Sequence, residues 1–125
     1  MNKSKFIAMV ISLFFSVAAN VSQATDGIIC SGTISILGLH TTDKVMLKLS
    51  GMNTVVQICD LNKTLGSSNP VSAEQCKAAY STLLTAYSLN KSLSIYFDNV
   101  GTGTSCSTFA GWEVATARWI PLTSD

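Results

Sequence analysis

Alternation between apolar and polar positions predicts five β-strands in the chain after residue 27. Residues 44–50 alternate most cleanly, and residues 92–98 repeat the pattern. The apolar face of each contains Val45, Leu47 and Leu49, and Leu93, Ile95 and Phe97. A Gly-Met-Asn turn separates residues 44–50 from the strand expected at 54–61, so these two form a hairpin. The other expected strands cover residues 28–39 and 112–122, and Pro121 ends the last strand or places it at an edge.

Helical spacing appears in one segment, which starts after the Gly/Ser/Asn/Pro loop at residues 62–70. Ser72 and Gln75 fit a capping box, in which each side chain bonds to the backbone of the other. An apolar stripe follows at steps of four, three and four, formed by Cys76, Tyr80, Leu83 and Tyr87. Asn90 suits the left-handed residue that ends a helix. The sequence therefore predicts one helix between the third and fourth strands.

The order of elements favours a mainly β fold, a five-stranded OB-fold-like barrel with the helix at one open end. Closing the barrel would hide the strand edges from other chains. A small open α+β sheet is the alternative. Trp112 and Trp119 are expected on opposite faces of the last strand, one in the core and the other on the surface.

Residues 1–24 have the three parts of a secretory signal peptide. Lys3 and Lys5 form a basic start, an apolar run follows, and Ser22-Gln23-Ala24 matches a signal-peptidase site. We expect cleavage after Ala24, which leaves residues 25–125 as a single secreted or periplasmic domain. Loss of the two lysines changes the formal net charge from +1 to −1. A near-neutral domain without a second long apolar run predicts neither nucleic-acid binding nor membrane insertion.

Four cysteines remain after cleavage, an even number that predicts two disulfides in an exported domain. Three pairings are possible. Cys59 ends the third strand and Cys76 lies in the first helical turn, which favours their bond. Cys30 then pairs with Cys106. The absence of a C-x-x-C motif argues against a metal site.

Little in the sequence indicates catalysis. His40 is the single histidine, and no G-x-S-x-G nucleophile motif or evident acid/base pair of carboxylates occurs. We therefore expect no catalytic residue, no cofactor and no bound metal. A small hydrolase that uses His40 is the competing hypothesis.

Three stretches resemble the binding subunits of bacterial AB5 toxins, most of all the subtilase cytotoxin and typhoid toxin group related to pertussis toxin. Residues 26–32 resemble the Asp-Gly…Ser-Gly opening of that family. Residues 80–87 resemble its single helix, and residues 94–98 resemble the following strand with its paired aromatic residues.

The resemblance implies a secreted homopentamer that binds a cell-surface glycan or glycoprotein and can carry a toxin A subunit. It places Ser31 on the acid group of a sugar, Asp26 nearby, and Tyr96 or Phe97 at the wall of the pocket. Phe97 stands where sialic-acid binders have a second tyrosine, so one hydroxyl contact is missing here. The alternative is a stand-alone periplasmic or secreted OB-fold domain that binds a protein partner.

Overall fold

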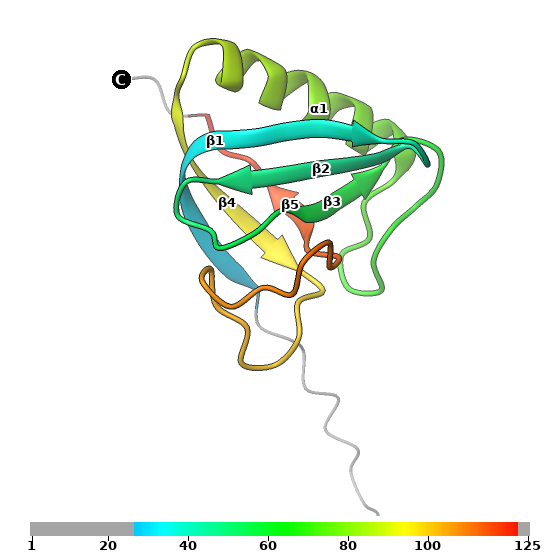
Figure 1. The fold of residues 1–125 in the computed structure, drawn as a ribbon. Helices are drawn as coiled ribbons and strands as arrows, with labels where there is room; N and C mark the ends of the chain where they lie inside the picture. The colour runs from blue at the N-terminus through cyan, green and yellow to red at the C-terminus, as the bar shows by residue number, and fades with distance from the viewer. Residues whose placement is uncertain (1–26, 123–125) are drawn as a thin grey trace, which may run out of the picture.

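A computed structural model describes residues 27–122, which form five antiparallel strands in one sheet and a single α-helix (Figure 1). The elements in chain order are β1 (Ile28–His40), β2 (Lys44–Leu49), β3 (Val56–Asp60), α1 (Ala73–Ser88), β4 (Ser92–Asp98) and β5 (Thr116–Trp119). The order three strands, helix, two strands agrees with the expectation. The expected signal peptide and Asp26 lie outside the described residues.

The strands pair in the order β3-β2-β1-β4-β5, and all four pairs are antiparallel. The sheet is not closed into a barrel, so the expected closed barrel is wrong and the open α+β alternative fits. Between the two end strands lies one parallel bridge, from Gln57 of β3 to Val114. The Gln57 amide donates to the Glu113 carbonyl at 2.8 Å, and the Ala115 amide donates to the Gln57 carbonyl at 2.9 Å. Within the described residues this pairing does not continue along β5.

A bend in β1 gives the sheet its curvature (Figure 1). The first half of the strand pairs with β4 up to Thr33, and the second half pairs with β2 from Ile34 onward. Gly32 lies at this change of partner with φ +142°, a conformation that side chains rarely adopt. A Cβ atom at this position would also collide with Ser50 and with the Gly51 amide nitrogen. Glycine is therefore required for the bend.

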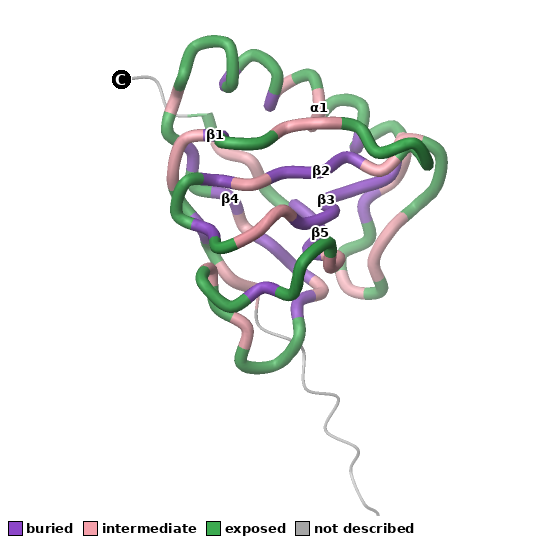
Figure 2. Tube along the Cα trace, viewed as in Figure 1, coloured by how far each residue is buried: buried purple, intermediate pink, exposed green. Residues whose placement is uncertain are grey.

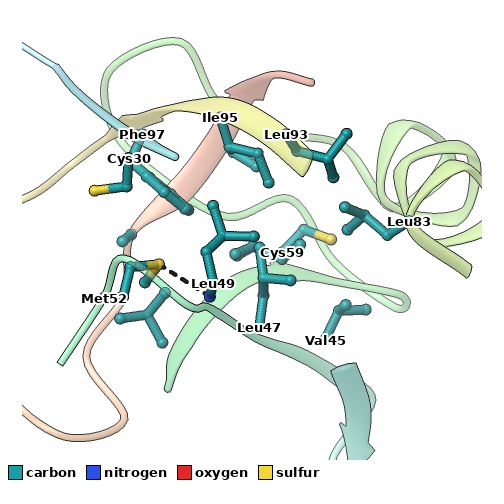
Figure 3. Close-up of a cluster of buried hydrophobic side chains, with 14 of the residues drawn as sticks. Cys30, Val45, Leu47, Leu49, Met52, Cys59, Leu83, Leu93, Ile95 and Phe97 are labelled. Carbon is teal, nitrogen blue, oxygen red and sulfur yellow. Dashed lines mark hydrogen bonds between the residues drawn. The ribbon is translucent and has the colours of Figure 1, made fainter. Parts of the chain in front are cut away.

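The core lies between the inner faces of the two halves of the curved sheet. Figure 2 shows β2 and β3 as mostly buried, whereas the outer side of α1 is exposed. Figure 3 shows inward side chains of the sheet, together with Leu83 of α1, gathered in one cluster. The predicted inward faces of residues 44–50 and 92–98 are confirmed: Val45, Leu47, Leu49, Leu93, Ile95 and Phe97 are all buried.

The helix begins and ends as predicted, but its buried stripe differs. Both hydrogen bonds of the capping box between Ser72 and Gln75 are present, and Asn90 has φ +51°. Ala86 is buried, whereas Tyr87, which was expected on the inner stripe, is 53% exposed. The buried stripe therefore continues from Leu83 to Ala86, three residues later, and not to Tyr87, four residues later. The small Ala86 side chain allows the helix to pack closely at this point.

Two disulfides connect the parts of the fold, and their pairs are those expected from the sequence. The Cys30–Cys106 bond ties β1 to the loop between β4 and β5, with Cα atoms 5.6 Å apart. The Cys59–Cys76 bond ties the end of β3 to the first turn of α1, with Cα atoms 5.5 Å apart. A domain of this size has a small core, so such cross-links contribute a large share of its stability.

The last strand is shorter than predicted, and its tryptophans do not divide between core and surface. Trp112 precedes β5 in a turn with φ +66° and is 62% exposed. Trp119 ends β5 and is 65% exposed. The expectation of one buried tryptophan is wrong, because it assumed one regular strand through both residues, whereas β5 covers only residues 116–119 and Trp112 lies in a turn before it.

Candidate functional site

The outer face of β1, β4 and β5 carries a row of large side chains across three strands. The register pairs Ile29 with Tyr96, and Tyr96 with Trp119. Ile29 is 58% exposed, Trp119 is 65% exposed, and Tyr96 between them is partly exposed. Directly opposed residues in neighbouring antiparallel strands lie side by side on one face. We call Ile29, Tyr96 and Trp119 the outer row.

Ser31 lies beside the outer row. It pairs with Ser94 in the β1–β4 register, and the two hydroxyl oxygens are 2.8 Å apart. Ser94 is two residues from Tyr96, so its side chain projects from the same face of β4. The structure thus brings together Ser31 and Tyr96, two of the residues that the toxin resemblance singled out.

Phe97 is placed elsewhere. Its side chain is fully buried and makes an edge-to-face contact with Phe109, with ring centroids 6.0 Å apart. It therefore cannot form the wall of an accessible pocket, and Tyr96 alone keeps that assignment. Asp26 lies outside the described residues, but Gly27 runs so close to Tyr96 that an added Cβ atom would overlap the Tyr96 ring.

Arg118 adds a cation that the sequence interpretation missed. Its guanidinium carbon lies 4.7 Å from the centroid of the Tyr96 ring. Its Nε donates to Asp98 Oδ2 at 2.6 Å, and Asn69 Nδ2 donates to the same oxygen at 3.3 Å. Because Asp98 is buried and the Arg118 side chain is 43% exposed, a buried carboxylate fixes a cation that remains accessible to solvent.

A β-bulge explains why Arg118 and Trp119 are both exposed. Tyr96 pairs with Trp119, but the next residue, Phe97, pairs with Ala117, so Arg118 is an extra residue in β5. An extra residue interrupts the alternation of side chains and re-aims one of them. One signal was available in the sequence: Arg118 is the single arginine of the chain and adjoins a tryptophan.

A groove of about 470 Å³ lies next to this face, between α1 and β5. Its helix side consists of Gln75, Ala78, Ala79 and Thr82. Its strand side consists of residues 117–120, and residues 69–71 also line it. Arg118 and Trp119 therefore border both the groove and the outer face.

His40 lies apart from the outer row in its contacts. Its Nδ1 is 3.4 Å from the Thr42 hydroxyl, and its ring meets Trp112 edge-on at 5.6 Å between centroids. These neighbours are a hydroxyl and an indole, so the contacts show no carboxylate that orients the imidazole as in a hydrolytic triad.

Residues 27–122 contain neither a candidate metal site nor a membrane-spanning helix. No three His, Cys, Asp or Glu side chains there are grouped so that they could hold a metal ion. No helix in the same residues is long and apolar enough to cross a membrane. No protein-family model, curated protein or solved structure matches the chain.

Chemically, the outer face combines aromatic rings, paired hydroxyls and one fixed cation. Exposed aromatic rings stack on apolar faces of ligands, and hydroxyls donate and accept hydrogen bonds. A guanidinium binds carboxylates through two parallel hydrogen bonds. The arrangement therefore suits a polar, acidic ligand that also has an apolar face.

Proposed function

We propose that this protein is a secreted, non-enzymatic binding module that recognises an acidic glycan, free or on a glycoprotein. The single observation that carries the proposal is that Arg118 is fixed by Asp98 and lies over the ring of Tyr96, a member of the outer row. A monosaccharide acid offers both a carboxylate and an apolar ring face.

The proposed contacts follow from the positions of the side chains. Trp119 and the exposed part of Tyr96 stack on the sugar ring, and Arg118 binds the carboxylate. The Ser31 and Ser94 hydroxyls donate hydrogen bonds to the sugar hydroxyls and accept hydrogen bonds from them. Each group lies on the paired strands β1, β4 and β5, so binding requires little ordering of the backbone.

A single shallow face gives weak binding, so we further propose that the module acts as a homo-oligomer, a pentamer as the AB5 resemblance implies. Several identical sites raise avidity without any new contact. The OB-fold-like topology, proposed here as the parent architecture, is supported by the strand order and by the parallel bridge between Gln57 and Val114. A toxin A subunit is the partner that the resemblance implies. The two disulfides are compatible with an extracellular or periplasmic location.

A glycan array probed with the mature protein, residues 25–125, tests the proposal, together with native mass spectrometry for the oligomer. We expect signals restricted to acidic glycans. Trp119→Ala and Arg118→Gln should each reduce binding by about tenfold or more, as expected for the loss of one stacking or charged contact.

The chain offers a matched control. Trp112 is as exposed as Trp119 but lies outside the outer row, so Trp112→Ala should leave binding unchanged. An array without signal, combined with a monomeric mass, would refute the proposal. Equal losses in the two tryptophan variants would refute the assigned face.

A further inference from the structure

The second edge of β5 has no strand partner in the described part of the chain. One edge pairs with β4, and β5 ends the strand order. The pairing to β3 stops at Ala115, one residue before β5 begins. Unpaired strand edges present backbone amide and carbonyl groups that can bind another extended chain.

This edge lines the groove between α1 and β5. The bulge at Arg118 places Ala117 on the buried face of β5 and Trp119 on the exposed face, so a groove along one face would not be lined by both. Here the four consecutive residues 117–120 all line it. Consecutive residues line a groove together when the backbone edge itself faces into it.

The opposite wall of the groove is one side of α1. Gln75, Ala78, Ala79 and Thr82 lie at helical spacing and so form one side of α1. The two alanines at the centre of this wall project only a methyl group. The groove volume of about 470 Å³ lies within the range of pockets that bind small ligands.

Charge defines the occupant further. Arg118 is the one charged residue among those that line the groove, and no acidic side chain lines it. The Arg118 side chain is partly exposed, although Asp98 binds its Nε. A segment with a carboxylate near its centre therefore complements the groove better than a basic one.

We propose that the groove between α1 and β5 binds an extended acidic peptide of a partner protein, which adds a strand to the free edge of β5. Main-chain hydrogen bonds to residues 117–120 supply most of the affinity, and Arg118 selects an acidic side chain. A peptide that pairs with residues 117–120 contributes about four residues to the added strand, since paired strands have the same rise per residue. The groove shares Arg118 and Trp119 with the glycan face proposed above, but its helix wall, Gln75, Ala78, Ala79 and Thr82, contributes nothing to the outer row.

The test uses a defined probe, an acetylated five-residue peptide of alternating threonine and valine with glutamate at the centre. It is titrated into isotope-labelled mature protein and followed by amide chemical shifts. We expect saturable shifts centred on residues 117–120. A glutamine version should bind about threefold more weakly, as expected for a half-exposed ion pair. A version with N-methylated backbone amides should lose binding, since it cannot complete the strand.

Two helix variants separate groove binding from other effects. Ala78→Leu fills the groove from an exposed position and should reduce peptide affinity by about tenfold or more. Ser81→Leu adds an exposed leucine on the same helix outside the groove and should leave affinity unchanged. Both variants should keep the glycan binding of the parent protein. The glycan array and the peptide titration can therefore fail separately, and each failure refutes only its own proposal.

Four outcomes would overturn the proposal. They are no saturable shifts with the glutamate peptide, equal binding of the N-methylated peptide, shifts centred on Ile29 and Tyr96 instead of residues 117–120, or a change of oligomeric mass in Ala78→Leu. The last result would mean that a second copy of the chain occupies the groove.

Discussion

The ion pair between Arg118 and Asp98 allows us to predict how much stability the protein loses when either partner is replaced. Arg118→Met keeps most of the side-chain length but removes the donor to Asp98 Oδ2, which then keeps the 3.3 Å bond from Asn69. The carboxylate stays buried, because Gly27 and Asn69 lie against Asp98 at the end of β4. Asp98→Asn instead removes the buried charge while keeping the shape of the side chain.

The size of each effect follows from burial. Removing one partner of a fully buried ion pair costs about 3–5 kcal/mol, because it leaves an uncompensated charge. Arg118 is 43% exposed, so water screens part of the interaction, and we discount the loss in Arg118→Met to about 2 kcal/mol. Asp98→Asn loses a charge-assisted hydrogen bond, about 1.5 kcal/mol. The double variant should cost about 1–2 kcal/mol less than the sum, because removing the carboxylate relieves the penalty of losing the guanidinium.

Urea unfolding of the mature protein and the three variants at pH 7 measures these free energies. Glu74 and Lys77 supply the control, an exposed ion pair of 2.9 Å on the surface of α1. Lys77→Met should change stability by no more than about 0.5 kcal/mol. Strict additivity of the two single variants, or a loss in Arg118→Met as small as in the control, would show that Asp98 does not fix the guanidinium.

Two further predictions concern stability. Replacing both cysteines of the Cys30–Cys106 disulfide, with sequence separation 76, by alanine should cost about 4.5 kcal/mol. The same change at Cys59–Cys76, with separation 17, should cost about 3 kcal/mol, because the longer loop restricts the unfolded chain more. Denaturant midpoints measure both losses of stability, and the reverse order would contradict the entropic explanation. Gly32→Ala should destabilise the protein by about 2 kcal/mol or more, because φ is +142° and the added Cβ meets Ser50 and Gly51. Gly38→Ala, where a Cβ meets nothing within 4 Å, should change the melting temperature little, and equal effects of the two would refute the role assigned to the bend.

Local physics made several elements predictable from the sequence. The bounds of β4 match the expected residues 92–98, because strict alternation and a turn residue on each side define them. The capping box at Ser72 also formed as predicted, since its two hydrogen bonds depend on neighbours three residues apart. The closure of the sheet was not predictable in this way. It depends on how far β3 and the segment before β5 pair, which here is one parallel bridge between residues 57 positions apart in the chain, Gln57 and Val114.

The candidate site likewise combines residues that the sequence predicted correctly with one that it did not. The toxin resemblance indicated Ser31 and Tyr96, and the register of β1 and β4 brings them to one face. It also offered Phe97, although the alternation of residues 92–98 already placed Phe97 with the inward side chains, and the structure buries it. Where a resemblance and the periodicity of a strand disagreed, the periodicity was the better guide, because it reflects which face of this sheet meets the core.

Arg118 shows why periodicity also has a limit. Strict alternation through β5 would place Arg118 and Trp119 on opposite faces, and the cation would then be separated from one of the two rings. The bulge opposite Tyr96 and Phe97 adds one residue to β5 and exposes both side chains. The same bulge lets the Asp98 carboxylate, at the end of β4, reach the Arg118 Nε. A single irregularity in pairing thus creates the proposed site, and a bulge depends on contacts between strands, not on any local sequence pattern.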